Sequence, residues 1–300
     1  MKTKIFWISM IVMMVVVGFS ALSSGSQSFN LVLGPDALFI EAEDYDYGGG
    51  KYLPSNSRTK NLFNDKGLYN GLGAISNIDY HADGDIANGQ EYRTGETKIG
   101  ITPINDPYPS GEVIRPGFGR GKGLDYRIGW NDGGDWFNYT RVFTSGLYEV
   151  YGRFSSGKRD IHAHLDLVAD IVASSSSLTL LGRFDSGDTD DWNNFVFVPL
   201  RNTDGQISRV ALNGEQTIRF TVDPGNLDIN YIVLVPVAEP RISVIKIDGQ
   251  EFLEWNDGVL QMAINENGPW VDVPNAHSPH KLTATMGTSK LFHRVIIRSR

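Results

Sequence analysis

From Ala37 onward, apolar residues recur at every second position, in short segments rich in β-branched and aromatic side chains. This period puts successive side chains on opposite faces of an extended chain, as in a half-buried β-strand. Turn-forming groups such as Thr144-Ser-Gly146, Asn213-Gly214 and Asp223-Pro-Gly225 separate the segments. The sequence therefore predicts an all-β fold.

The predicted strands group into two units. The eight clearest are Ala37–Glu43, Asp135–Phe143, Leu147–Phe154, His162–Val168, Leu178–Phe184, Phe195–Leu200, Gln216–Val222 and Asp228–Val235. This spacing predicts an antiparallel β-sandwich jelly roll over residues 36–237. After two prolines, Pro236 and Pro240, residues 241–300 hold five shorter strand candidates and predict a small β-rich C-terminal module.

A long polar stretch, residues 48–122, lies inside the first unit and contains Tyr69, Tyr80, Tyr92 and Tyr108. Loops of this length in a compact domain are usually functional or disordered. Because the tyrosines can pack, we expect an ordered covering over the sandwich.

The first residues resemble a targeting segment. Lys2 and Lys4 precede an apolar run from Ile5 to about Phe19, and small residues follow, as in a secretory signal peptide spanning residues 1–23. The run is shorter than the roughly 20 apolar residues of a membrane-spanning helix. We expect cleavage near Ser23 and a secreted, extracellular or cell-surface protein. The chain has no cysteine, so neither a disulfide framework nor a lipid anchor on cysteine can hold it.

The net charge limits the partners. The whole chain carries −8; without Lys2 and Lys4 it has 25 basic and 35 acidic residues, which gives −10. An acidic surface without a basic run argues against nucleic acid and against anionic membrane after signal cleavage. Neutral ligands or cations fit this charge better.

Candidate chemistry is sparse. The chain lacks the Walker phosphate loop, the H-E-x-x-H zinc motif and the G-x-S-x-G hydrolase motif. His162 and His164 lie on one strand face, and we interpret them as surface residues. Glu41 and Glu43 are two apart on a predicted strand, so both carboxylates point to one side. Three interpretations of this pair stay open: a cation site, a catalytic pair of carboxylates, or a solvated strand edge.

Five blocks of sequence, in order, resemble family 6 carbohydrate-binding modules. They are IEAEDYDYGGG (40–50), IDYHADGDIANGQEYR (78–93), YRIGWNDGGDWFNYTRVFTSGLYEVYGRFSSG (126–157), DTDDWNNFVFVPL (188–200) and NLDINYIVLV (226–235). The resemblance covers roughly residues 37–236. It implies a galactose-binding-like β-sandwich jelly roll, a structural calcium and a polysaccharide cleft without catalysis.

The resemblance also assigns roles to individual residues. It implies that Glu41, Glu43 and Asn230 ligate Ca²⁺, and oxygen ligands of this kind suit a hard cation. It implies that Trp130 and Trp192 clamp a sugar ring, with Asp228 as its hydrogen-bonding partner. Aromatic faces pack on sugar C–H groups, and hydroxyls need polar partners.

The remaining tryptophan of the third block, Trp136, is expected in the core because it lies inside a predicted strand. Two positions depart from the family pattern, which more often has Asn at Asp228 and Trp at Tyr231. Asp accepts hydroxyl hydrogen bonds but does not donate them when ionised.

The expected function is non-catalytic binding of a β-linked plant or algal polysaccharide, alone or beside secreted glycan-degrading enzymes. One alternative is a glycoside hydrolase or lyase component that uses paired carboxylates. Another is a cell-envelope structural or adhesion protein without a sugar site. The C-terminal module, containing LEWNDGVLQMAINENGPWVDVPNAHSP at 253–279, resembles small β modules of secreted bacterial proteins.

Overall fold

The computed structural model describes residues 33, 36–53, 69–83, 92–93, 99–104, 125–157, 159–171, 177–238, 241–282 and 291–296. The predicted signal peptide, residues 1–23, lies outside this set. Within it, no helix is long and apolar enough to cross a membrane.

Apart from one 3-10 turn, η1 (Ala42–Asp44), all of the regular secondary structure in the described residues is β-strand. The first group of strands is β1 (Leu38–Glu41), β2 (Tyr80–His81), β3 (Gly100–Pro103), β4 (Tyr126–Asn131), β5 (Trp136–Ser155), β6 (Ile161–Val168), β7 (Leu178–Ser186), β8 (Val196–Arg201), β9 (Arg209–Val222) and β10 (Leu227–Val237). The second group is β11 (Ile242–Ile247), β12 (Gln250–Trp255), β13 (Val259–Ala263), β14 (Val271–Asp272), β15 (His280–Lys281) and β16 (Phe292–Ile296). The predicted all-β class, an antiparallel sandwich jelly roll followed by a small β-rich module, is confirmed.

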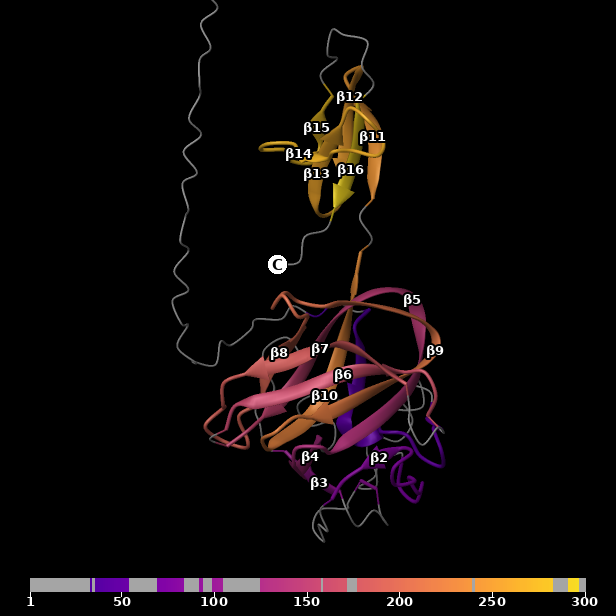
Figure 1. Cartoon of the computed structure of the whole chain (residues 1–300), viewed down its shortest axis with the longest axis vertical. Coiled ribbons are helices and arrows are strands. Elements are labelled where there is room, and N and C mark those ends of the chain that lie inside the picture. Colours follow the sequence, from indigo (N-terminus) through magenta and orange to yellow (C-terminus); the bar gives the residue numbers. More distant parts are fainter. Residues whose placement is uncertain are drawn as a thin grey trace, which may run out of the picture.

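Strands β1 to β10 belong to one hydrogen-bonded network in the order β3-β4-β10-β5-β8-β7-β6-β9, with β1 beside β10 and β2 beside β5. The first part of β5 pairs with β9, and its last part pairs with β8 and β10. The same strand thus runs through both layers of the sandwich (Figure 1).

The period-two pattern supplies the core. Phe154, Phe184 and Phe220 are fully buried, and their ring centroids lie 5.2, 5.3 and 5.9 Å apart. They come from β5, β7 and β9, so the core is built from strands distant in sequence. Aromatic pairs at this spacing add favourable contacts to the burial of apolar area.

Two predicted turns are not turns. Thr144-Ser-Gly146 lies inside β5 and Asn213-Gly214 lies inside β9. The two segments face each other across a register shift, where Phe143 pairs with Gly214 and Gly146 pairs with Leu212. Gly214 has φ +67°, a left-handed conformation that glycine adopts at little cost. The turn-forming residues therefore mark an irregularity in two long paired strands.

The predicted first strand is shorter than expected. It ends at Glu41, and the next three residues form η1. Glu41 and Glu43 therefore do not alternate along one strand, so the inference that both carboxylates point to one side for that reason is wrong.

Part of the stretch 48–122 is described and packs on the sandwich. Tyr69, Tyr80 and Tyr92 are buried, as expected of an ordered covering, and Tyr108 lies outside the described residues. Arg93 is fully buried with its guanidinium 3.6 Å from the centroid of the Tyr45 ring. This contact ties the covering to the segment that follows β1.

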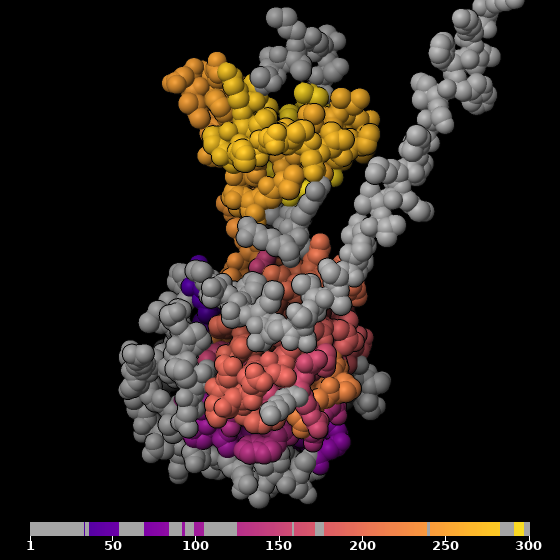
Figure 2. All heavy atoms as spheres, turned by 90° about the vertical axis from the view of Figure 1, so that its left-hand side faces the viewer, coloured from indigo at the N-terminus to yellow at the C-terminus, as the bar shows by residue number. Residues whose placement is uncertain are grey.

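Strands β11 to β16 form two three-stranded sheets, β11-β12-β15 and β14-β13-β16. Leu253, Trp255 and Leu260 make the buried centre of this unit. Figures 1 and 2 show these strands, in orange and yellow, gathered apart from the first group. Strands β11 and β13 begin and end at the residues that the sequence predicts.

Candidate functional site

Two exposed tryptophans lie where β4 and the β7–β8 connection meet. Trp130, in β4, is 50% exposed, and Trp192, in the β7–β8 connection, is 40% exposed. A Cβ added to Gly100 would lie 2.4 Å from Cε3 of Trp130, and one added to Gly157 would lie 2.8 Å from Nε1 of Trp192. Each ring therefore rests directly on the backbone of a glycine.

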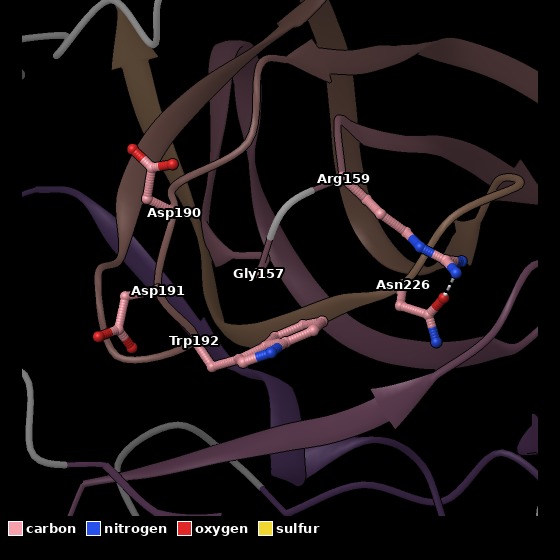
Figure 3. Close-up of a pocket in the computed structure, with 6 residues that line it drawn as sticks. All are labelled: Gly157, Arg159, Asp190, Asp191, Trp192 and Asn226. Atoms are coloured by element: carbon pink, nitrogen blue, oxygen red, sulfur yellow. Dashed lines mark hydrogen bonds between the residues drawn. The ribbon is translucent and has the colours of Figure 1, made fainter.

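The Trp192 ring borders a cavity of about 530 Å³ (Figure 3). It is lined by Gly157, Arg159, Asp190, Asp191, Trp192 and Asn226. Nη1 of Arg159 donates to Oδ1 of Asn226 at 2.8 Å on the side facing the ring, while the two aspartate side chains point away from the ring. An aromatic surface beside an exposed guanidinium and amide can stack on a ring and donate to its hydroxyls.

Asp228 is not among the residues that line the cavity; its carboxylate lies beside the backbone of Gly129 and Trp130. It is the second residue of β10, is 4% exposed, and has its Oδ2 3.0 Å from Nη1 of Arg127. Burial raises the pKa of Asp228 to about 6, opposed by the Arg127 charge and by a hydrogen bond from the backbone N–H of Trp130. The role of hydrogen-bonding partner to the sugar, which the resemblance implies for Asp228, stays a prediction, and this buried placement does not favour it.

Arg127 connects several parts of the site. Besides the ion pair with Asp228, its Nη1 donates to the backbone carbonyl of Trp192 at 2.6 Å, and its Nε donates to Oγ1 of Thr102 at 3.2 Å. The Trp192 carbonyl also accepts from Oγ of Ser155 at 2.7 Å. The loop that carries Trp192 is thus fixed to β4 and β5.

The third tryptophan, Trp136, is not a core residue. It is half-buried, with the Arg219 guanidinium 3.7 Å from its ring centroid and the His81 ring stacked at 6.3 Å. Its β5 neighbours Phe137 and Tyr139 point inward and are fully buried. The alternation along β5 puts Trp136 on the outer face, so the core interpretation is wrong for this residue.

The predicted calcium ligands are all buried: Glu41 is 2% exposed, and Glu43 and Asn230 are 0% exposed. Oδ1 of Asn230, the atom that would face a cation, accepts from Nη1 of Arg153 at 2.6 Å. Its Nδ2 donates to Asp125 and to the carbonyl of Tyr126. Asn230 therefore does not fit as a ligand, since a guanidinium already occupies its carbonyl oxygen.

Within the part of the chain that the structure describes, no three His, Cys, Asp or Glu side chains are grouped to hold a metal. His162 and His164 instead pair with carboxylates. Nδ1 of His162 is 2.8 Å from Asp185, and Nδ1 of His164 is 2.9 Å from Asp223. The side chain of His162 is 44% exposed and that of His164 is 20% exposed, so the interpretation as surface residues suits His162 better than His164.

His164 predicts a pH dependence of stability. A hydrogen bond to Asp166 raises its pKa above the usual 6.5; burial opposes this, and the nearby Asp223 adds to it. A raised folded-state pKa gives stability that is complete below the unfolded pKa and is lost as pH rises through the folded pKa. In urea unfolding, the advantage of the wild type over His164→Gln should therefore be larger at pH 6 than at pH 8. An equal difference at both values would contradict the assigned ion pairs, and the exposed His277→Gln serves as control.

Three residues of the site escape sequence reasoning: Arg127, Arg159 and Asn226. Each acts across a long sequence separation, as in the contact between Arg127 and Trp192, 65 residues apart. Arg127 and Asn226 lie in two of the blocks that carry the resemblance, and Gly157 in one of these blocks leaves room for the Trp192 ring.

Comparisons with known proteins give structural similarity only. No protein-family model matches the chain, and no curated protein matches it. Among solved structures, a family 6 carbohydrate-binding module from Clostridium stercorarium in complex with cellobiose is 15% identical and has a TM-score of 0.37; the match covers 70% of this chain and 100% of that one. A C-terminal family 6 module of a marine laminarinase from Zobellia galactanivorans is 17% identical and has a TM-score of 0.36; the match covers 67% of this chain and 99% of that one. A family 43 arabinoxylan arabinofuranohydrolase from Bacillus subtilis is 14% identical and has a TM-score of 0.34; the match covers 57% of this chain and 30% of that one.

Proposed function

We propose that the chain is a secreted, non-catalytic carbohydrate-binding protein of the family 6 type, and that it binds a β-linked plant or algal polysaccharide. The observation that carries this proposal is the pair of exposed tryptophans, Trp130 and Trp192, each seated on a glycine and joined through Arg127 and Asp228. Exposed tryptophans held in fixed positions lose little side-chain entropy when a ligand stacks on them.

The polar partners in this proposal are Arg159 and Asn226. Both line the cavity beside Trp192. Arg159 is exposed and Asn226 is partly buried, so a sugar hydroxyl can reach them. Asp228 contacts the backbone of Trp130 directly and that of Trp192 through Arg127. One small cleft binds weakly, and useful affinity then comes from several copies or from a tethered enzyme.

The direct test is binding of the mature chain to a panel of soluble polysaccharides, by affinity electrophoresis and calorimetry, with reducing-sugar release measured in parallel. Retention on a β-glucan, xylan or galactan without sugar release supports the proposal. Sugar release would favour the hydrolase or lyase alternative. No retention on any member would favour a structural or adhesion protein.

We further propose that calcium stabilises the fold at Glu41 and Glu43. Two carboxylates this close in sequence are almost completely buried, and buried carboxylates are paired or bind metals. With calcium at about 100 times its dissociation constant, binding adds about 2.7 kcal/mol, which corresponds to a melting temperature higher by roughly 5–10 °C.

Adding EDTA should therefore lower the melting temperature of the wild type by this amount, and excess Ca²⁺ should restore it. Glu43→Gln should melt lower and lose its sensitivity to EDTA. Glu254→Gln, an exposed glutamate of β12, is the matched control. A wild-type melting curve that EDTA leaves unchanged would exclude a stabilising calcium.

A further inference from the structure

We propose that Asp228 and Arg127 are positioning residues that hold both tryptophan surfaces in place through one ion pair, and that Asp228 does not itself bind sugar. This inference rests on the proposed function for its binding consequence, but its structural part can be tested without a glycan. It differs from the role that the resemblance implies for Asp228.

The first step is the burial of Asp228. Its side chain is 6% exposed and that of Arg127 is 15% exposed. A carboxylate at this depth needs a charged partner and hydrogen bonds, and Arg127 with the Trp130 N–H provides them. With so little of its side chain exposed, Asp228 offers a sugar hydroxyl almost no accessible surface, whereas Arg159 and Asn226 line the cavity.

The second step is the connection to Trp130. Its backbone has φ +58°, a left-handed conformation that is uncommon for a bulky residue and needs support from its surroundings. The Asp228 carboxylate accepts the N–H of this residue. A Cβ added at Gly129 would lie 2.9 Å from Oδ1 of Asp228, so the glycine before Trp130 makes room for the carboxylate.

The third step is the connection to Trp192. Arg127, held against Asp228, donates to the Trp192 carbonyl, and Nε of Arg127 bonds to Thr102 in β3. Asp228 therefore reaches Trp130 directly and Trp192 through Arg127. Three strands and one loop meet at this ion pair, and changing either partner alters the support of both rings.

The experiment compares Arg127→Gln, Asp228→Asn, the double variant and Arg127→Lys, with Arg201→Gln as control. Arg201 donates to the carbonyl of Gly205 and lies outside the site. The indole N–H signals of Trp130 and Trp192 are followed by ¹H–¹⁵N NMR in the ligand-free protein, and affinity is measured for the best glycan of the panel. Circular dichroism checks that each variant is folded.

Asp228→Asn should shift both indole signals, including that of Trp192, and should weaken binding by tenfold or more. The double variant should bind no worse than the weaker single variant, because both changes break one unit. Arg127→Lys keeps the charge near Asp228 but lacks the guanidinium fork, so it should shift the Trp192 signal more than the Trp130 signal. If Asp228→Asn fails to fold, the larger shift of the Trp192 signal than of the Trp130 signal in Arg127→Lys tests the positioning role in its place.

Loss of affinity in Asp228→Asn with both indole signals unchanged would overturn the proposal and make Asp228 a direct sugar partner. Unchanged signals in Arg127→Lys would overturn it as well. If the wild type binds no glycan, the proposed function fails, while the indole shifts still decide the positioning role.

Discussion

Under the proposed function, replacing Trp192 by alanine is expected to abolish measurable retention on the polysaccharide that the panel identifies. Its ring forms one side of the cavity and is fixed by Gly157 beneath it and by the bonds from Arg127 and Ser155 to its carbonyl. A fixed, exposed aromatic side chain of this kind carries about 2 kcal/mol or more of a binding energy, which equals roughly 30-fold in affinity. Since a single weak site has little affinity to spare, such a loss removes detectable binding.

Trp130→Ala should weaken binding by a similar factor, because its ring is the other exposed aromatic surface. The matched control is Trp270→Ala, a partly buried tryptophan of the C-terminal unit, which should bind as the wild type does. Calorimetry and affinity electrophoresis measure the effect. Wild-type affinity in Trp192→Ala would show that the cavity at Trp192 is not the glycan site.

Replacing Arg93 by methionine is expected to destabilise the fold by about 3–5 kcal/mol, because two buried carbonyls each lose a charged donor, a bond worth about 1.5–3 kcal/mol. Arg93 is fully buried and donates to the carbonyls of Tyr45, at 2.6 Å, and Asp46, at 3.2 Å. Methionine keeps much of the volume but offers no donor, so these carbonyls lose their partner inside the protein. The stacking of the guanidinium on the Tyr45 ring is lost as well.

Urea unfolding followed by circular dichroism gives the free energy directly. Arg183→Met is the matched control: the Arg183 side chain is 53% exposed and pairs with Asp223, so its loss should cost at most about 1 kcal/mol. Equal stabilities of the two variants would mean that Arg93 does not anchor the covering segment.

The sequence predicts the strands well where one face is buried. In β6, Ile161, Ala163 and Leu165 are buried and alternate with less buried neighbours, so the period is visible without any knowledge of the partners. It fails where an irregularity inside a strand uses the same residues as a turn, as at Gly146 and Gly214. Local chemistry cannot distinguish the two, because pairing with a distant strand decides which one forms.

The candidate site also contains some residues that the sequence indicates and some contacts that it does not. The resemblance selects Trp130 and Trp192 from two of its sequence blocks, and the structure leaves both side chains exposed. The buried pair of Arg127 and Asp228 joins positions about a hundred residues apart, and no property of either residue alone indicates the contact. The Asn230–Arg153 bond is hidden for the same reason.

Strand β10 has a mechanical consequence. It begins beside the candidate glycan site at Asp228, ends at Val237, and leads within a few residues into the C-terminal unit at Ile242. Along most of this length it is bonded to β5, and β1 pairs with it as well. If the C-terminal unit is held while a glycan is bound, a pulling force runs along β10, at right angles to its interstrand hydrogen bonds. These bonds then share the load in shear instead of opening one after another, so β10 would resist extraction from the sheet more strongly than a strand that is peeled from one end.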